Sequence, residues 1–276
     1  MPAVIHLYFQ PSALSPEPKP NVLMSRISHW RVALAACLAI VATSAAHASV
    51  VLAGTRVIYP ETEREVTLRL TNEGTAPALV QAWIDDGDAN AAPDDTHAPF
   101  TLAPPLFRLD PRKGQALRII YLQQPLPTDR ESLFWLNVLE VPPMAADGAA
   151  QRNELQFAFR TRIKLMFRPR GLPGSADAAP ASVRWRLLRK ADGQQVLSAT
   201  NPTPYHVTFT VVEAGVGSAV HRNDAGAMAA PGATVEFPLG DAVRGSVDAG
   251  EVRHVTINDF GAAVEGVSRI AAAPTD

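Results

Sequence analysis

The chain has 276 residues, enough for one or two domains, and an ordinary globular composition with 47% hydrophobic and 19% charged residues. Its formal net charge of -2 gives no electrostatic support for a general nucleic-acid-binding role. The single cysteine, Cys37, lies in a segment that we expect to be removed, so disulfides, thiol catalysis and cysteine metal sites are excluded from the mature protein.

Residues 1–48 differ in character from the rest of the chain. Arg26 and Arg31 precede the apolar run VALAACLAIVATSAA, and the small-residue motif AHA follows at 46–48. This pattern predicts a secretory signal peptide that is cleaved after Ala48, with Met24 as an alternative start of translation. The competing interpretation is a membrane anchor, but the run is only about 15 residues long, and about 20 are needed to span a bilayer. We therefore expect an exported protein.

Between residues 50 and 168, short segments alternate apolar and polar residues and end in Gly, Pro, Asn or Asp. They are SVVLAGTRVIYP, REVTLRLTNEG, ALVQAWIDDGD, QALRIIYLQ, SLFWLNVLEVPP and ELQFAFRTRIKLMFRP. Since no convincing helix separates them, they predict a β-sandwich. The last segment is unusual, because strict alternation runs over about 14 residues, against the 5–6 of a typical strand. One face carries Leu155, Phe157 and Phe159, followed by Thr161, Ile163, Leu165 and Phe167.

Residues 169–182 are rich in Pro, Gly and Ala and predict a linker. A second, weaker series of strand-like segments follows it. The predicted organisation is an extension and signal at 1–48, a first sandwich at 49–168, the linker, and a second sandwich at 183–276. The fold class is all-β.

The mature sequence shows little enzymatic chemistry. His97, His206, His221 and His254 have no metal-ligand spacing, and neither a nucleophile motif nor a phosphate-binding loop is present. The acidic stretch at 85–95 is similar to a calcium loop but lacks the glycine and glutamate spacing of an EF-hand, so a solvated loop is the favoured interpretation.

Two basic residues lie on strands that a sandwich can bring together. Arg56 belongs to the first predicted strand and Lys164 to the long last one. If these strands are neighbours, the two side chains converge and form a site for an anion such as a carboxylate. The alternative is that each is an exposed strand residue without a role.

Six segments, in order, resemble the periplasmic pilus-assembly chaperones of the PapD-like family. They are GTRVIYPETEREVTLRLTNEG, QAWIDDGD, PLFRLDPRKGQALRI, RESLFWLNV, RIKLMFRP and INDFGA. The resemblance implies two immunoglobulin-like sandwiches arranged in an L, no catalysis and no cofactor or metal. It further implies periplasmic localisation and, as partners, pilus subunits and an outer-membrane usher, with self-association of the free form left open.

The resemblance also assigns roles to individual residues. Arg56 and Lys164 match the pair that anchors the terminal carboxylate of a subunit. Leu155, Phe157 and Phe159 match the residues of a donor strand that completes the subunit's fold by β-augmentation. Glu131, Arg168 and Asp259 match an inter-domain charge network, for which the alternative is ordinary surface ion pairing. The short loop at 142–153 resembles the family branch that serves rod-like pili.

Two other classes of protein remain to be weighed. A pilin or adhesin built from immunoglobulin-like domains would normally lack a strand and carry an N-terminal donor extension, whereas this chain has a complete strand set and an overlong internal strand. A periplasmic enzyme on a sandwich scaffold lacks candidate catalytic residues. Recovery of a subunit in a 1:1 complex would identify a chaperone.

Overall fold

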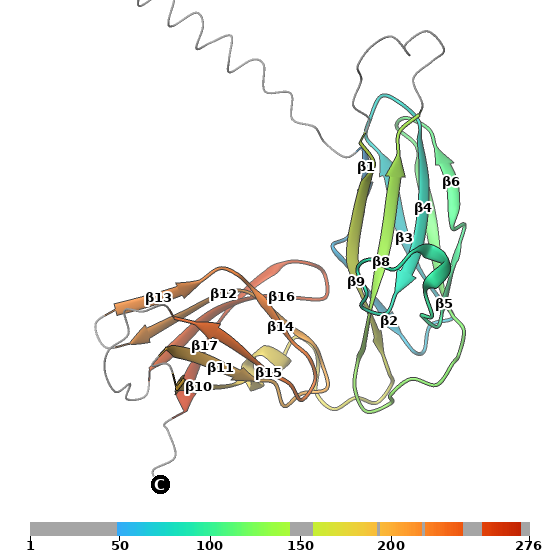
Figure 1. Cartoon of the computed structure of the whole chain (residues 1–276). Coiled ribbons are helices and arrows are strands. Elements are labelled where there is room, and N and C mark those ends of the chain that lie inside the picture. Colours follow the sequence, from blue (N-terminus) through green and yellow to red (C-terminus); the bar gives the residue numbers. More distant parts are fainter. Residues whose placement is uncertain (1–48, 144–156, 192–193, 217–218, 240–249, 272–276) are drawn as a thin grey trace, which may run out of the picture. The chain divides into compact units, whose positions relative to one another are not determined.

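The computed structural model describes residues 49–143, 157–191, 194–216, 219–239 and 250–271 (Figure 1). Within these residues the chain is almost entirely β-strand, and helix is limited to two 3-10 turns, η1 (Pro93–Asp95) and η3 (Ala179–Ser182). The predicted all-β class is confirmed. The predicted leader at 1–48, the loop before the long strand and Leu155 lie outside the described residues.

The described residues of the first sandwich form nine strands in two sheets. A four-stranded sheet has the order β1-β3-β7-β5 and a five-stranded sheet the order β2-β9-β8-β4-β6. The strands are β1 (Val50–Leu52), β2 (Arg56–Pro60), β3 (Glu65–Asn72), β4 (Ala78–Asp85), β5 (Phe100–Ala103), β6 (Leu106–Leu109), β7 (Gly114–Tyr121), β8 (Ser132–Val141) and β9 (Phe159–Arg168).

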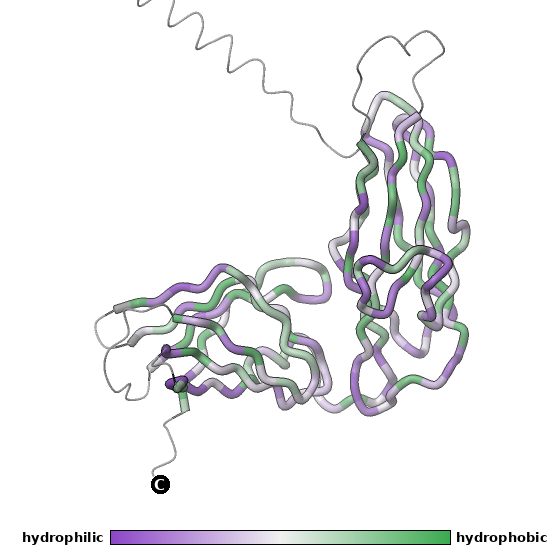
Figure 2. The backbone as a smooth tube through the Cα atoms, in the orientation of Figure 1, coloured by the Kyte–Doolittle hydropathy of each residue, from purple (hydrophilic) through white to green (hydrophobic). Residues whose placement is uncertain are grey.

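The core of this sandwich follows from the period of two along each strand, which Figure 2 shows as alternating hydrophobic and hydrophilic colours. Leu68 and Leu70 of β3 are buried in the same apolar cluster as Ile163, Leu165 and Phe167 of β9, as the alternation predicts. Residues of both sheets form one continuous apolar cluster, which is the usual basis of a stable sandwich.

The first predicted strand is in fact two strands in different sheets. β1 pairs with β3 in one sheet, the chain crosses at residues 53–55, and β2 pairs in parallel with β9 in the other sheet. Sequence alternation does not distinguish one continuous strand from two strands in different sheets, because β1 and β2 both bury alternate residues. The short strands β5 and β6 were also missed, because Pro104 and Pro105 give their segment the composition of a loop.

The second sandwich is formed by β10 (Arg184–Arg189), β11 (Gln195–Thr200), β12 (Val207–Val216), β13 (Ala219–Asn223), β14 (Ala227–Ala229), β15 (Thr234–Pro238), β16 (Glu251–Ile257) and β17 (Ala263–Ala271). The strands β10, β11 and β15 form one layer and the other five strands the second layer, joined by parallel pairing of β10 with β17. Trp185, Phe209 and Phe237 are buried together between the layers.

Part of the connection between the two sandwiches packs against the core of the second. Leu172 and Ala176, inside the predicted linker, are partly buried against the second core, and Ala179 of η3 belongs to that core. The second sandwich therefore recruits residues from the Pro- and Gly-rich stretch that composition alone presents as a linker.

Candidate functional site

The parallel pairing of β2 with β9 places Arg56 directly opposite Lys164. Neighbouring parallel strands lie about 4.8 Å apart, and paired residues project to the same face of the sheet. The structure therefore brings together the two basic residues for which the sequence predicts convergence. Both side chains project from the face of the five-stranded sheet that lies opposite the apolar core.

The guanidinium of Arg56 is only partly satisfied. One terminal nitrogen donates a hydrogen bond of 3.0 Å to the carbonyl of Ile257, at the end of β16 in the second sandwich. Its Nε is buried without a partner among the described residues. Burial lowers the pKa of Arg56, and the charge of Asp259 opposes this effect. Since a guanidinium has five N–H donors, most of them remain for an incoming acceptor.

Lys164 is a partly buried cation beside another cation. Its Nζ donates a 3.1 Å hydrogen bond to Thr208 Oγ1 on β12 and lies 5.9 Å from the centre of the Trp135 ring. Burial, and then the positive charge of Arg56, lower the pKa of Lys164 to about 8. Neither cation forms an ion pair with a carboxylate among the described residues. Two adjacent cations without a counter-ion favour the binding of an anion.

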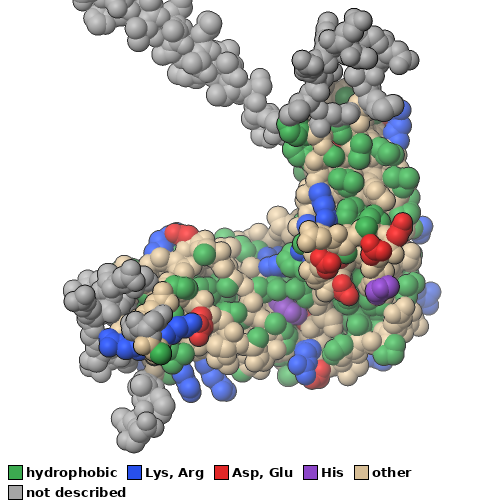
Figure 3. Space-filling model, in the orientation of Figure 1, with side chains coloured by type: hydrophobic (Ala, Val, Ile, Leu, Met, Phe, Trp, Pro, Cys, Tyr) green, Lys and Arg blue, Asp and Glu red, His purple; other side chains and the backbone are tan. Residues whose placement is uncertain are grey.

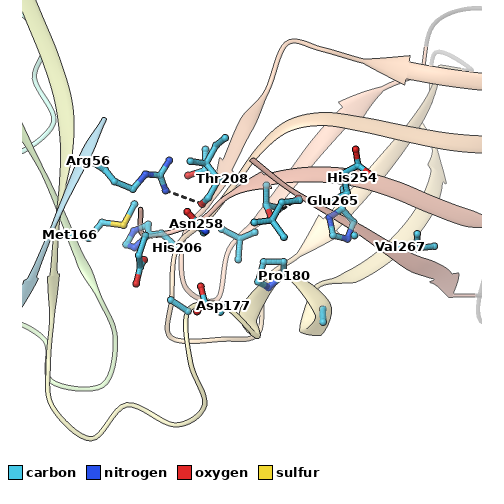
Figure 4. A pocket seen from close by; sticks show the side chains of 18 residues that line it. Arg56, Met166, Asp177, Pro180, His206, Thr208, His254, Asn258, Glu265 and Val267 are labelled. Atoms are coloured by element: carbon cyan, nitrogen blue, oxygen red, sulfur yellow. Dashed lines mark hydrogen bonds between the residues drawn. The ribbon is translucent and has the colours of Figure 1, made fainter. Parts of the chain in front are cut away.

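A pocket of about 310 Å³ opens beside Arg56 (Figure 4). Arg56 and Met166 line the pocket from the first sandwich, and His206, Thr208 and Asn258 contribute polar groups from the second. Thr208 lines the pocket and also accepts the hydrogen bond from Lys164. The pocket is therefore continuous with the Arg56–Lys164 pair.

Glu131, Arg168 and Asp259 form a connected network. Arg168 donates 2.7 Å from Nε to Glu131 and donates two further hydrogen bonds, of 2.7 and 2.9 Å, to the carboxylate of Asp259. Glu131 also accepts from the backbone N–H of His206, at 2.8 Å. The Glu131 side chain is only 1% exposed, so the alternative of ordinary surface ion pairing does not describe this network. The two carboxylates raise the pKa of Arg168 even though burial acts in the opposite direction.

One edge of β9 changes along its length. Residues Lys164–Phe167 pair with β2 on one side and β8 on the other, and Arg168 pairs with β2. Residues Phe159–Ile163 pair with β8 only, and on their other side the described residues supply no strand. Phe159 is 36% and Phe157 57% exposed, whereas Ile163, Leu165 and Phe167 are buried. Apolar side chains are visible over much of the surface in Figure 3, so exposure alone does not distinguish these two. Phe159 begins β9 at its open edge, whereas Phe157 lies two residues before the strand, which is shorter than the alternating run in the sequence.

A second network on β9 was not predicted from the sequence. Asp85 was assigned to the solvated acidic loop, and that assignment is wrong for this residue, because its side chain is fully buried. Arg162 donates two hydrogen bonds to it, and Asn137 donates a third at 2.7 Å. Burial alone would raise the pKa of Asp85, but the bonds from Arg162, Asn137 and the Gly87 amide leave it lowered. The missed signal is the position of Asp85, two residues after Trp83 on the same strand face.

These contacts fix the arginines of β9 over aromatic rings. The Arg162 guanidinium lies 4.1 Å from the centre of the Trp135 ring, and that of Arg160 lies 4.7 Å from Trp83. Cation–π contacts, together with the hydrogen bonds from Arg160 to Asn137, therefore fix the arginine side chains on the outer face of β9. Phe159 belongs to the other face of the same strand.

The described parts of the chain contain no cluster of three His, Cys, Asp or Glu residues that could bind a metal ion. Among the same residues there is no helix with the length and hydrophobicity required to cross a membrane.

Comparisons with known proteins agree with these observations. Residues 49–173 match the family model described as "Pili and flagellar-assembly chaperone, PapD N-terminal domain", and residues 178–268 match "Pili assembly chaperone PapD, C-terminal domain". The "Chaperone protein FimB/FhaD" of Bordetella pertussis is 45% identical over 244 residues, which cover 85% of this chain and 96% of that protein.

The "Probable fimbrial chaperone YadV" of Escherichia coli K12 is 41% identical over 230 residues, 83% of this chain and 92% of its own length. The crystal structure of the YadV chaperone superposes with a TM-score of 0.67 at 39% identity, covering 81% of this chain and all of that one. The SafB chaperone of Salmonella enterica, solved in complex with the SafA pilin, gives a TM-score of 0.65 at 28% identity and covers 83% of this chain and 98% of that one. The two predicted immunoglobulin-like sandwiches are thus confirmed, and the chain belongs to the PapD family of pilus-assembly chaperones.

Proposed function

We propose that this chaperone is a periplasmic protein that binds pilus subunits through the open edge of β9 and delivers them to an outer-membrane usher. The proposal rests on two features of the described residues. The edge of β9 at Phe159–Ile163 has no neighbouring strand, and Arg56 and Lys164, on the paired strands β2 and β9, have no acidic ion-pair partner. The open edge can accept an added strand, and the two cations can bind the carboxylate at the end of that strand.

The open edge of β9 supplies backbone donors and acceptors for an added strand. Strand addition gives affinity through main-chain hydrogen bonds and specificity through alternate side chains. Leu155, Phe157 and Phe159 are proposed as the donor row that fills the apolar groove of an incomplete subunit. Phe157 and Phe159 are exposed in the free chain and have large apolar surfaces to bury.

Arg56 and Lys164 are proposed to bind the terminal carboxylate of the subunit. They lie where β2 begins to cover the edge of β9, so an added strand that runs along the open part of the edge ends beside them. A carboxylate accepts hydrogen bonds from both groups, and charge-assisted bonds are stronger than neutral ones. Anchoring one end of the strand also selects one register, because a slip by one residue turns every side chain to the wrong face.

The proposed compartment and partners have separate support. The signal-like composition of residues 24–48 favours export, with cleavage after Ala48. The SafA–SafB complex is that of a related chaperone with a pilin, which supports a pilus subunit as the partner here. The absence of catalysis and delivery to an usher are proposed from family membership. The same open edge would also permit self-association of the free chaperone.

The test is co-expression with the pilus subunit of the same organism, followed by purification of the chaperone from the periplasm. Arg56→Ala or Lys164→Ala is expected to weaken subunit binding by roughly 10–150-fold, since each removes a charge-assisted bond of about 1.5–3 kcal/mol. Arg108→Ala is a matched control, because Arg108 is an exposed strand residue whose side chain forms, among the described residues, an ion pair with Asp110 alone. Normal recovery of the subunit with both Arg56 and Lys164 replaced would exclude the anchoring role.

A further inference from the structure

Glu140 lies on the inward-facing side of β8, where the other residues belong to the apolar core. Along β8, the inward-facing residues are Phe134, Leu136 and Val138, all buried in the apolar cluster of the first sandwich. Glu140 continues this row and is 7% exposed. A carboxylate at such a site is stable only if hydrogen bonds and an opposite charge replace the water that it has lost.

The donors that reach Glu140 come from the beginning of the described chain. The backbone nitrogen of Ser49 lies 3.2 Å from Oε1, the Ser49 hydroxyl also donates to Oε1, and the Val50 nitrogen donates to Oε2 at 3.0 Å. The described residues offer this carboxylate no Lys, Arg or His ion pair. Glu140 thus has hydrogen bonds but no counter-charge in the described part of the chain.

Ser49 itself is held firmly at this place. Its carbonyl accepts a 2.7 Å hydrogen bond from the Glu73 backbone. Its Cβ packs so closely on Gly74 that a Cβ at residue 74 would come within 2.6 Å of it. The next residue, Val50, starts β1 and pairs with Asn72. Ser49 is therefore a fixed part of the first sandwich, immediately after the small-residue motif at 46–48.

We propose that cleavage after Ala48 converts the Ser49 nitrogen into the counter-ion of Glu140. The inference rests on the export and cleavage proposed above. A signal peptidase adds water across the Ala48–Ser49 peptide bond, so the carbonyl of Ala48 gains the hydroxyl and leaves as a carboxylate, while the Ser49 nitrogen gains protons and becomes an ammonium. A neutral N–H donor 3.2 Å from a buried carboxylate is thereby replaced by a positive charge. Removal of the leader completes the ion pairing of the first sandwich.

The proposal fixes the direction of a pH effect. An α-amino group ordinarily titrates near 7.7–8, and an adjacent carboxylate raises its pKa. A pKa raised in the folded state contributes stability that is present below the unfolded value and is lost as the pH rises through the folded value. Among the described residues, the charged side chain in contact with this amine is Glu140 of β8, and its carboxylate favours the ammonium. Glu73, Arg112 and Lys113 approach the same end of β3 through their backbone atoms.

The experiment uses the whole gene, exported and purified from the periplasm. N-terminal sequencing is expected to give Ser49 as the first residue. Insertion of Gly-Ser between Ala48 and Ser49 moves the new ammonium away from Glu140 but retains the amides of Ser49 and Val50. This insertion is expected to raise the equilibrium constant for unfolding by about 10–100-fold in the wild-type protein, and to have almost no effect in a Glu140→Gln background.

Several outcomes would overturn the proposal. Mature protein that starts elsewhere than Ser49 would do so, as would an equal cost of the insertion in both backgrounds. Coupling of Glu140→Gln to Arg152→Ala, instead of to the insertion, would place the counter-ion in the loop before β9. If Glu140→Gln does not fold, the stability difference between the inserted and normal proteins is measured from pH 6 to 10, and it must diminish at high pH. Subunit capture is assayed in parallel with Arg56→Ala, whose result bears on the proposed function alone.

Discussion

The amine of Lys164 differs from an ordinary surface lysine because the fold holds it against Arg56 and away from water. Its pKa of about 8 is below the ordinary value, so the charged form carries a cost in the folded state. That cost is present below pH 8 and is relieved as the pH rises through this value. An incoming carboxylate reverses the balance, since it stabilises the ammonium. The charged form of Lys164, which is unfavourable in the free chaperone, would thus become favourable in the proposed complex.

The affinity for the subunit is therefore expected to depend on pH. It should be nearly constant from pH 6 to 7.5 and fall above about pH 8, by at most about tenfold per unit, as the free amine loses its proton. Lys164→Arg should flatten this profile, because a guanidinium keeps its charge over the whole range. Dissociation constants for purified chaperone and subunit, measured between pH 6 and 9.5, provide the check. Parallel profiles for the two proteins would show that Lys164 does not titrate in binding.

The two halves of β9 differ in their neighbouring strands. The second half lies between β2 and β8, and the first half pairs with β8 alone among the described residues. Phe157 and Phe167 belong to the same alternating row, yet Phe157 is 57% exposed and Phe167 is 2% exposed. The same substitution at these two positions therefore separates a role in binding from a role in the core.

Phe157→Asp is expected to leave the thermal melting temperature of the free chaperone close to that of wild type, and to abolish subunit capture because a carboxylate would enter an apolar groove. Phe159→Asp should behave similarly. Phe167→Asp, the matched control, should lower stability by several kcal/mol because it buries a charge in the core. Circular dichroism melts and co-expression with a subunit measure the two effects. Normal capture by Phe157→Asp would contradict the donor-strand assignment.

At this scale the sequence was informative wherever one face of a strand is apolar. Alternation identified the buried row of β9, and the convergence of Arg56 with Lys164 followed from the neighbouring positions of first and last strands. It could not show that the first strand is divided between two sheets, because both halves obey the same period. Asp85 was misassigned for a related reason: a buried carboxylate is identified by its partners, which lie on other strands.

In the whole molecule, residues of the first sandwich with proposed roles also contact the second sandwich. Arg56 donates to the carbonyl of Ile257, and Arg168 connects Glu131 to Asp259. Because β9 carries both Lys164 and Arg168, these contacts act on the same strand that is proposed to bind the subunit. Sequence motifs predicted the members of the network, but their burial follows from tertiary packing, which no local pattern encodes.

Arg168→Ala is expected to lower the free energy of unfolding by about 3–5 kcal/mol, because it leaves the buried carboxylate of Glu131 without its charged partner. Arg170→Ala is a control two residues away, because the Arg170 side chain is 80% exposed and its ion pair with Glu61 is long, at 3.9 Å. This substitution should change the free energy of unfolding by less than about 0.5 kcal/mol. Urea titrations of both variants compare the two values. Equal small effects would indicate that the network contributes little to stability.

The parallel pairing of β2 with β9 also has a consequence for the order of events in the proposed export. Arg56 lies near the start of the first sandwich and Lys164 in its last strand, so the two cations meet only after every intervening strand has reached the periplasm. Contacts between distant parts of a chain form late, because the loop between them must close first. A partly synthesised chaperone therefore lacks the complete pair of cations, so the proposed binding of a subunit requires a finished first domain.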